Sequence, residues 1–333
     1  MDEDVSSVGN REAPEPGENV RGETGCGCGS GDDKEVLDVV IIGGGPAGIA
    51  CAIQLQRMGA APLLIEKSRL GGLLRYANFV ENYPGFPAGI SGVKLAERMD
   101  AQLRASGVTH IKADVGQVWK NGENFLLRAD ESEILCKKLI VASGSRPTRV
   151  EFEVLGNPLI TYDLFDLLDG DATEIAIIGG GDVAFDHAVR LAECGKKVTI
   201  LSRGEPRANC PLLNATRKLG IRVITGAGIK SISGNGRGAV VVHERGKTDA
   251  DAVLVACGRE PRLLKFQDGL IATDDNGRSA AAVSGLYIIG DARGAWRHAG
   301  IAVGDGLSCA MDIFKELRRE RDAHAVCEEV NEL

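Results

Sequence analysis

The sequence predicts an α/β fold with two similar units, because two glycine-rich turns each follow an apolar strand and precede a helical pattern. The first turn follows the apolar run 39–42 and has glycines at positions 43, 45 and 48. The second turn follows the apolar run 175–178, with glycines at 179 and 181 and an alanine at 184. A chain of 333 residues also has the length expected of two domains.

The spacing G-x-G-x-x-G in the first turn is typical of a dinucleotide-binding Rossmann unit. The first glycine permits the tight turn, the second lets the backbone approach a pyrophosphate, and the third lets the helix pack closely on the strand. The helix N-terminus then offers free N–H groups to the phosphates. An acidic residue ends the next apolar strand, where it meets the adenosine ribose. The predicted site comprises Gly43, Gly45, Pro46, Ala47, Gly48 and Glu66.

The second turn predicts a second nucleotide site, at Gly179, Gly181, Asp182, Val183 and Ala184. Here the next strand ends in Ser202 and Arg203 and lacks the acid. Guanidinium groups at this strand end, from Arg203 and Arg207, suit a 2′-phosphate, so NADPH is favoured over NADH. The alternative is that both arginines are ordinary solvated charges. Together the turns predict two Rossmann-like, three-layer ββα dinucleotide-binding domains.

The remaining pattern supplies further elements in chain order. Helices are expected near 91–106 and about 183–194, and from about 300 to 328. Strands are expected at 109–115, 124–129, 135–142, 198–201 and 286–289, with short strands and a hairpin over 222–257.

Charge and composition exclude several classes of function. Of the net charge of −8, −7 lies in residues 1–35, which leaves a nearly neutral body without the basic stripe of a nucleic-acid-binding protein. No uninterrupted apolar run of about 18 residues predicts a membrane span, and the acidic N-terminus lacks the features of a secretory signal. Nine cysteines without framework spacing fit a reducing cytosol, so a cytoplasmic location is expected.

Residues 1–35 are predicted to be a flexible acidic arm, since they offer almost nothing to bury. Near its end lie Cys26 and Cys28 in a glycine tract. Three interpretations stay open: a redox dithiol, half of a metal site, or an incidental feature. A metal site needs more ligands than these two cysteines, and no nearby histidine supplies them, so no bound metal is expected. The segment from Cys28 to residue 39 can extend on the order of 35 Å, far enough to reach a redox site.

Over about residues 36–320 the chain resembles the low-molecular-weight thioredoxin reductase family. The resemblance rests on both glycine turns, on 71–74 followed by 80–85, and on Gly290-Asp291 followed by 297–299. It implies FAD in the first unit, NAD(P)H in the second, and a homodimer. It also implies a discontinuous FAD-binding domain (36–149 and 254–325), an inserted NAD(P)H-binding domain (150–253), and a tail at 326–333. Further residues implied at the cofactors are Gly72, Leu73, Leu74, Asn82, Gly144, Gly290, Asp291, Arg297, His298 and Ala299.

The sequence departs from this family at the redox-active cysteines. The family carries a Cys-x-x-Cys pair before the second glycine turn, but 159–166 has no cysteine, and neither does 67–87, where the glutathione reductase type places its disulfide. At the position where the family usually has glutamine beside the flavin stands His298. It either replaces the hydrogen bonds of that glutamine or acts as a proton donor, because imidazole titrates near neutral pH.

The predicted function is transfer of electrons from NAD(P)H through FAD to an external acceptor. The first candidate acceptor is a disulfide or dithiol, such as a protein thiol or a lipoyl group, with Cys26 and Cys28 as a shuttle. The second is a ferredoxin-like or flavodoxin-like carrier. A low-molecular-weight disulfide is a third, and a flavin-binding redox sensor is the non-enzymatic alternative. Without a disulfide in the inserted domain, we expect one dominant arrangement of the two domains.

Overall fold

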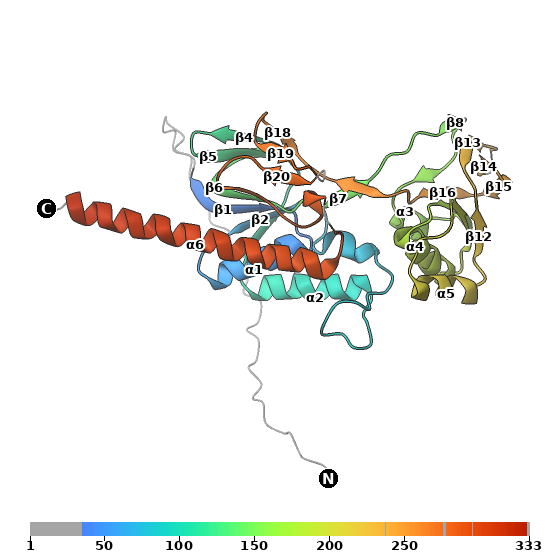
Figure 1. Ribbon diagram of the computed structural model, residues 1–333, viewed down its shortest axis with the longest axis horizontal. Helices are drawn as coiled ribbons and strands as arrows, with labels where there is room; N and C mark the ends of the chain where they lie inside the picture. The colour runs from blue at the N-terminus through green and yellow to red at the C-terminus, as the bar shows by residue number, and fades with distance from the viewer. Residues whose placement is uncertain (1–34, 237, 276–277, 295, 332–333) are drawn as a thin grey trace, which may run out of the picture. The chain divides into compact units, whose positions relative to one another are not determined.

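The computed structural model describes residues 35–236, 238–275, 278–294 and 296–331, so Cys26 and Cys28 lie outside the described residues. Within these ranges the chain forms two separate parallel-centred sheets, each with its own helices (Figure 1). We call the first sheet with its helices the first lobe, and the second sheet with its helices the second lobe.

The first lobe contains an eight-stranded sheet in the order β18-β4-β5-β6-β1-β2-β3, with β21 paired to β6. Its centre is parallel, whereas β4 and β5 form an antiparallel hairpin that continues antiparallel into β6. Two of its strands come from the C-terminal part of the chain. The strands are β1 (Val36–Ile42), β2 (Leu63–Glu66), β3 (Thr109–Lys112), β4 (Val115–Asn121), β5 (Asn124–Ala129), β6 (Ser132–Val141), β18 (Lys265–Phe266) and β21 (Leu286–Ile288).

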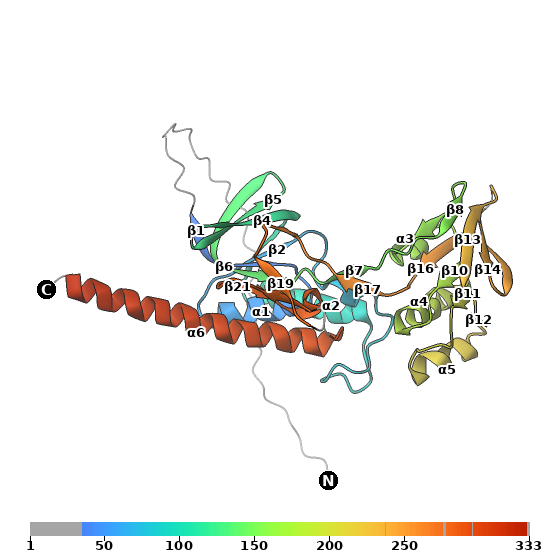
Figure 2. The same cartoon turned by 45° about the horizontal axis from the view of Figure 1, so that its top comes forward.

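Three helices lie together on one face of this sheet: α1 (Pro46–Arg57), α2 (Gly92–Ala105) and α6 (Ala299–Asn331) (Figures 1 and 2). The close approach of α6 to α1 depends on Gly306, because a Cβ atom there would overlap the carbonyl oxygen of Ala47. The largely buried Lys138 on β6 forms ion pairs with Glu316 at 3.0 Å and Glu320 at 2.7 Å, which hold α6 against the sheet. Two helices from opposite ends of the chain therefore share one apolar core.

The second lobe contains a five-stranded parallel sheet in the order β12-β11-β10-β16-β9. Helices α3 (Phe165–Leu168), α4 (Asp182–Glu193) and α5 (Cys210–Lys218) belong to one apolar core, and a second sheet, β15-β14-β13-β8, forms another core on the opposite face. This is the three-layer ββα arrangement expected. The strands are β8 (Glu153–Leu155), β9 (Ile160–Thr161), β10 (Glu174–Ile178), β11 (Lys197–Ser202), β12 (Arg222–Thr225), β13 (Ile229–Gly234), β14 (Ala239–His243), β15 (Gly246–Ala250) and β16 (Ala252–Val255).

The structure corrects some predicted elements. The strand expected at 109–115 ends at Lys112, and the chain turns into β4, whose existence the sequence analysis missed. The backbone N–H of Asp114 donates to the Asp130 carboxylate, which fixes this turn beside the β5–β6 hairpin. Strand β16 also continues the second sheet to Val255, past the expected domain boundary at 253/254. The short pairs β7 (Ser145–Pro147) with β17 (Arg259–Pro261) and β19 (Ile271–Thr273) with β20 (Ser279–Ala281) were not expected either.

Candidate functional site

The first glycine turn connects β1 to α1, and its three glycines occupy different environments. Gly43 has a φ of +109°, and a Cβ atom there would overlap the carbonyl oxygen of Ala142 at the end of β6. A Cβ atom at Gly48 would overlap the carbonyl oxygen of Gly43 itself. At Gly45, in contrast, a Cβ atom would meet no other atom within 4 Å. The turn is therefore closed on the strand side and open at the glycine that is expected to face a pyrophosphate.

Two distant segments close on this turn. Gly72, in the 3-10 helix η1 (Gly72–Tyr76), lies so that a Cβ atom would be 3.2 Å from the Cα atom of Gly45. Gly290, at the start of η2 (Gly290–Arg293), would place a Cβ atom 2.9 Å from the Cβ atom of Ala47. Gly72 and Gly290, which the resemblance implied at the cofactor, are thus brought to the predicted turn.

Glu66 ends β2 next to the same turn. Its Oε2 atom accepts the N–H of Gly44 at 2.6 Å, and its Oε1 atom accepts the N–H and hydroxyl of Ser68 at 2.8 and 3.1 Å. These bonds fix the carboxylate at the strand end, where a ribose is expected. A pocket of about 410 Å³ adjoins it, lined from β2, β3, α2 and η1 by residues that include Ser68, Arg69 and Lys112.

Asp291 belongs to a network of polar groups from three segments. The Ser145 hydroxyl donates to Asp291 Oδ2 at 3.2 Å, and Arg259 Nε donates to the same hydroxyl oxygen at 3.0 Å. Arg297 donates to the carbonyl oxygen of Arg259 at 2.7 Å. Burial raises the pKa of the Asp291 carboxyl, while Ser145, Arg297 and Arg259 act to lower it. The network joins the η2 segment to the loop that contains Gly144.

His298 lies directly before α6, and its ring has a structural role that the sequence analysis missed. The N–H of Gly300 donates to His298 Nδ1 at 3.1 Å, and the N–H of Ala302 donates to the His298 carbonyl oxygen at 2.9 Å. Because Nδ1 accepts, the neutral ring carries its proton on Nε2. Ala299 begins the helix. Asn82 is exposed, and it forms no hydrogen bond with the residues that the structure describes.

The second glycine turn, between β10 and α4, repeats the geometry of the first. Gly179 has a φ of +156°, and a Cβ atom there would overlap the carbonyl oxygen of Ala256 at the end of β16. No atom lies within 4 Å of a Cβ position at Gly181, so this glycine is also open. Ala184 takes the third position, and its Cβ atom would be 3.0 Å from a Cβ atom at Gly179.

The strand that follows the second turn, β11, ends differently from β2, the corresponding strand of the first lobe. Ser202 packs against Gly180 and donates its hydroxyl to the carbonyl oxygen of Gly204 at 2.7 Å. The backbone N–H of Arg207 donates to the carbonyl oxygen of Gly180 at 2.7 Å, which holds 203–207 against the turn. Arg203 is exposed and has no ion-pair partner in the described part of the chain. Asp182 accepts the N–H of Asn209 at 2.8 Å, and Val183 is exposed at the start of α4.

The stretch that lacks the family's cysteines takes part in polar contacts with the first lobe, which the sequence analysis also missed. The Tyr76 hydroxyl donates to Asp163 at 2.8 Å, and Tyr76 packs edge-on against Phe165 with ring centroids 4.8 Å apart. Burial, with Asp163 as acceptor, raises the pKa of Tyr76 to about 12. Arg190 donates to the carbonyl oxygens of Arg75 and Tyr76 at 3.1 and 3.3 Å.

The same face of α4 carries two titratable groups with shifted pKa values. Asp186 accepts the N–H of Asn78 at 2.9 Å, and Glu193 accepts from the Asn78 side chain at 3.0 Å. Burial raises the pKa of Asp186 to about 6, against the opposing effects of the Asn78 hydrogen bond and Arg190. Burial lowers the pKa of His187 to about 4, and its Nδ1 atom has no hydrogen-bond partner among the described residues. We call residues 75–78, Asp163 and this α4 face the interlobe contact.

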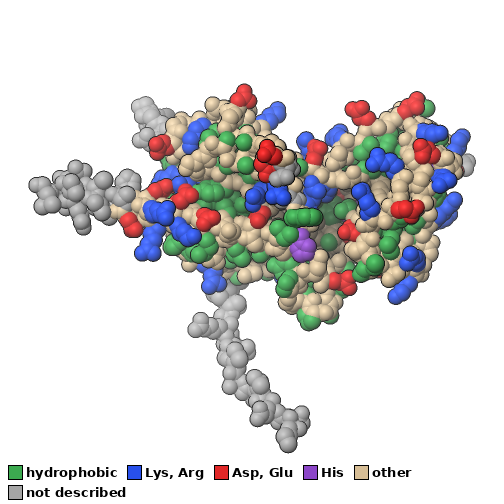
Figure 3. All heavy atoms as spheres, viewed as in Figure 1, with side chains coloured by type: hydrophobic (Ala, Val, Ile, Leu, Met, Phe, Trp, Pro, Cys, Tyr) green, Lys and Arg blue, Asp and Glu red, His purple; other side chains and the backbone are tan. Residues whose placement is uncertain are grey.

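Four further observations on the described residues concern cysteines, metal ligands, membrane spans and surface charge. The six described cysteines, at 51, 136, 194, 210, 257 and 309, are all free thiols. Across the described ranges, no three His, Cys, Asp or Glu side chains are grouped as metal ligands. The helices found there are too short or too polar to cross a membrane. Figure 3 shows basic and acidic side chains interspersed over the face that it displays.

Comparisons with known proteins agree with this geometry. The sequence model of the pyridine nucleotide-disulphide oxidoreductases matches residues 37–306. A ferredoxin–NADP reductase from Ignicoccus hospitalis is 29% identical over 302 residues, which span 84% of this chain and 98% of that protein. A thioredoxin reductase from Mycolicibacterium smegmatis is 30% identical over 310 residues, which span 86% of this chain and 98% of that protein.

A solved structure is similar over the same region. The crystal structure of Lactococcus lactis thioredoxin reductase in its FR conformation aligns with a TM-score of 0.73 at 28% identity. The alignment covers 84% of this chain and 98% of that one. The similarity therefore includes both lobes.

Proposed function

The chain belongs to the pyridine nucleotide-disulphide oxidoreductase family, and from this premise we propose how it acts and what it reduces. It is an FAD-dependent NAD(P)H oxidoreductase of the thioredoxin reductase-like type. The observation that carries this function is the pair of glycine turns, each closed on its strand and open at its middle glycine. When bound, FAD supplies the chemistry of taking hydride from a nicotinamide and passing electrons to an acceptor.

We propose that the first turn holds FAD. The open backbone at Gly45 and the start of α1 would face the pyrophosphate, Glu66 the adenosine ribose, and Asp291 the ribityl chain. The fit is supported by the approach of Gly72 and Gly290, whose missing side chains leave room at the turn. His298, with its proton on Nε2, would present a hydrogen-bond donor beside the flavin and so replace the usual glutamine there. The corresponding domain boundaries are 36–149 with 256–325, adjusted for the end of β16.

We propose that the second turn holds NADPH in preference to NADH. Arg203, which has no ion-pair partner among the described residues, is free to bind a 2′-phosphate at the strand end, and Arg207 is held nearby through its backbone. Ser202, unlike a carboxylate, does not repel a phosphate. Arginine binds such a group through several N–H donors at once.

For the acceptor we propose a disulfide or dithiol substrate that reaches the flavin through Cys26 and Cys28. The support is indirect: the stretch 159–166, where the family carries its cysteines, here has Tyr162 and Asp163, and Asp163 is bound to Tyr76. That stretch therefore offers no thiol to relay electrons from the flavin. The two cysteines of the arm, which lies outside the described residues, would take over this role.

A one-electron protein carrier is the second candidate. The relative from Ignicoccus hospitalis is named a ferredoxin–NADP reductase, and it matches over nearly its full length. The strongly exposed Trp296 stands next to Arg297, where the flavin is expected, and offers a contact for such a carrier. This candidate requires no cysteine.

An anaerobic titration with NADPH and with NADH, counting electrons taken up per FAD, separates the candidates. It is run on the wild type and on the double variant Cys26→Ser/Cys28→Ser. Uptake of about four electrons that falls to about two in the variant supports the dithiol shuttle, because a disulfide is a two-electron couple. Uptake of about two electrons by both proteins rejects the shuttle and favours the carrier. No reduction by either nucleotide contradicts an oxidoreductase and favours a redox sensor.

We also propose one dominant arrangement of the two lobes. The interlobe contact supports it, since Arg190, Asp186 and Glu193 all bind backbone or side-chain groups of 75–78. Distances between fluorophores on the two lobes should give a single population, and Arg190→Gln should broaden it. Two well-populated distances in the wild type would contradict the proposal.

A homodimer and a cytoplasmic location complete the proposal. The apolar residues Ile301, Leu307 and Met311 are exposed along one helix, α6, and offer a surface for a second copy. Sedimentation of the wild type and of Leu307→Glu tests this surface. The six free thiols are in keeping with a reducing compartment.

A further inference from the structure

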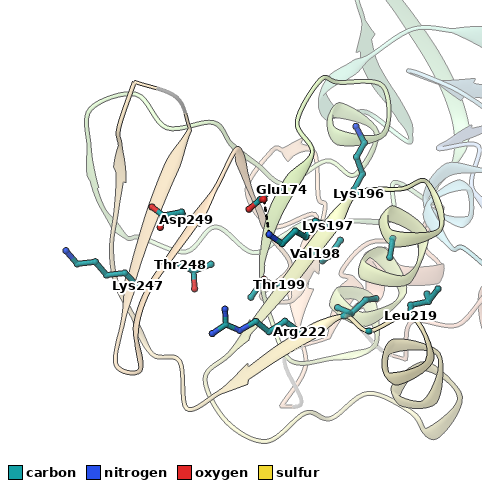
Figure 4. Close-up of a pocket in the computed structure, with 13 residues that line it drawn as sticks. Glu174, Lys196, Lys197, Val198, Thr199, Leu219, Arg222, Lys247, Thr248 and Asp249 are labelled. Carbon is teal, nitrogen blue, oxygen red and sulfur yellow. Dashed lines mark hydrogen bonds and ion pairs between the residues drawn. The ribbon is translucent and has the colours of Figure 1, made fainter.

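The second lobe has a pocket of about 400 Å³ at the edge of its sheet opposite to the glycine turn (Figure 4). It opens at the amino ends of β10, β11 and β12 and is closed on one side by β15. The glycine turn follows the carboxyl end of β10, so the length of that strand, roughly 15 Å, separates the two places. A ligand in this pocket would not touch the predicted dinucleotide site.

The lining contains four basic side chains and two acidic ones, Glu174 and Asp249, and two of the basic side chains have no partner among the described residues. Lys197 is paired with Glu174 at 2.9 Å, and Lys196 donates to the carbonyl oxygen of Gly170 at 2.8 Å. The side chains of Arg222 and Lys247 form no hydrogen bond or ion pair with any residue that the structure describes. In Figure 4, Arg222 lies near Thr248 and Thr199, whereas the side chain of Lys247 extends away from them.

The buried hydroxyl of Thr248 provides a further donor. Thr248 is only 8% exposed, and its oxygen lies 3.1 Å from Nε2 of the buried His243. The N–H of Arg245 donates to Nδ1 of the same ring at 3.2 Å, so the neutral ring must carry its proton on Nε2. His243 therefore donates to Thr248, and the Thr248 hydroxyl proton is left without an acceptor in the described structure. A ligand oxygen in the pocket would supply one.

Interaction with nearby helix C-termini explains only some of the polar and basic residues in this pocket. Helices α4 and α5 end at this edge, and cations near a helix C-terminus offset its partial negative charge. That accounts for Lys196, which follows α4. It does not account for the hydroxyl of Thr248, which is buried in the same lining.

We propose that this pocket binds a small phosphorylated compound, whose phosphate is held by Arg222 and the Thr248 hydroxyl. A guanidinium group together with a hydroxyl donor matches the oxygens of a phosphate. The apolar side chains of Val198, Leu219 and Ile221 line the same pocket and would contact the remainder of the compound. The volume is that of a small-molecule site.

Arg222 also links the pocket to a measurable signal. The pKa of His243 is lowered by burial and by the charge of Arg222. An anion on Arg222 would offset that charge and raise the pKa of His243. The side-chain resonances of this histidine should therefore respond to occupancy, and the variant His243→Gln identifies them among the five histidines.

The test is a titration of the full chain with inorganic phosphate, followed by NMR of the histidine side chains. The protein is first saturated with NADP⁺, so that the predicted 2′-phosphate site is filled. We expect a saturable shift of the His243 signals in the wild type. Arg222→Gln should weaken phosphate binding at least about fivefold, Thr248→Val should weaken it severalfold, and Thr248→Ser should restore it. Lys230→Gln, an exposed cation on β13 outside the pocket, is the matched control and should leave binding unchanged.

Two outcomes would overturn the proposal. One is a His243 shift that sodium chloride of equal ionic strength reproduces, since that would be charge screening alone. The other is unchanged phosphate affinity in Arg222→Gln. Neither outcome bears on the proposed oxidoreductase function, because no pocket residue belongs to either glycine turn.

Discussion

The two glycine turns are nearly the same structure in two different settings. In both, the first glycine packs on a carbonyl oxygen at the end of the neighbouring strand, from Ala142 in one lobe and from Ala256 in the other. In both, the middle glycine is open. They differ in the residue that ends the next strand: Glu66 binds the first turn through its carboxylate, whereas Ser202 packs on the second and leaves arginines around it. In the proposed function, the backbone of each turn admits a dinucleotide, and the residue at the strand end selects between nucleotides.

The helices that follow the two turns, α1 and α4, also make different kinds of contact with the rest of the chain. Helix α1 packs against α6 so closely that Gly306 is required at the contact. Helix α4 instead turns a polar face, with Asp186 and Arg190, toward residues 75–78 of the first lobe. The close apolar contact between α1 and α6 would lose buried area and packing if the helices separated, so it should stay closed. A contact made of hydrogen bonds and a few charges depends on single side chains, so a substitution such as Arg190→Gln can loosen it.

We expect the two turns to differ most in their response to substitution at the third position, which is Gly48 in the first turn and Ala184 in the second. Gly48→Ala would place its Cβ atom on the Gly43 carbonyl oxygen, whereas the second turn already accepts Ala184 there. We expect Gly48→Ala to lose bound FAD almost completely and to be destabilised by about 3–5 kcal/mol. Ala184→Gly should keep its FAD and lose about 1 kcal/mol. Flavin absorbance per protein and thermal unfolding measure both, and equal FAD loss in the two variants would refute the distinction.

The α1–α6 contact gives the next largest effect. Gly306→Ala forces a Cβ atom against Ala47 and should cost about 2–3 kcal/mol. Gly304→Ala is the matched control on the same helix, because no atom lies within 4 Å of its Cβ position. That control should be neutral or should stabilise by up to about 1 kcal/mol, since alanine favours helix. Denaturant unfolding compares them, and similar losses in both would mean that α6 does not depend on the close approach.

Removal of the arginine at the second strand end should separate the two nucleotides. Arg203→Ala is expected to raise the KM for NADPH about 10- to 150-fold, by loss of a charge-assisted bond worth roughly 1.5–3 kcal/mol. The KM for NADH should change less than about twofold. Steady-state kinetics with both nucleotides gives the ratio. A parallel loss with NADH would show that Arg203 contacts the shared part of the cofactor.

The smallest effect concerns pH and the interlobe contact. The pKa of Asp186 is raised to about 6 in the folded protein, so its contribution to stability is full below about pH 4 and is lost as the pH rises through 6. The groups facing it are His187, Arg190 and Glu193. Asp186→Asn does not titrate and should therefore gain about 1–2 kcal/mol relative to wild type between about pH 4.5 and 7.5.

Thermal unfolding of both proteins at the two pH values measures this difference. The pKa of His187 is lowered to about 4, so its own contribution is lost as the pH falls, but it is common to both proteins and cancels in the comparison. A constant difference between the variants across this range would show that the carboxyl is not buried in the contact.

Local patterns predicted more of this molecule than contacts between distant segments. Both turns, their strands and their helices follow from residues within a few positions of each other. The approach of Gly290 to Ala47 does not, because no local pattern records which distant segment closes a turn. The placement of Asp291 near the first turn was predicted only by the family resemblance. The hydrogen bond from Gly300 to His298 was not predicted, because both interpretations of the ring concerned the flavin and neither concerned the start of the following helix.

The order of the strands also has a consequence for biosynthesis. Strand β6 cannot pair with β21, nor can α6 cover α1, until residues beyond 286 have left the ribosome. The second lobe, at 150–255, is complete well before then. During translation the inserted lobe can therefore finish folding while the lobe that encloses it in sequence still exposes the apolar face of α1. The first strands and helix to be made therefore wait longest for their partners. A nascent chain that has emerged from the ribosome as far as about residue 270 would hold one finished lobe and one open one.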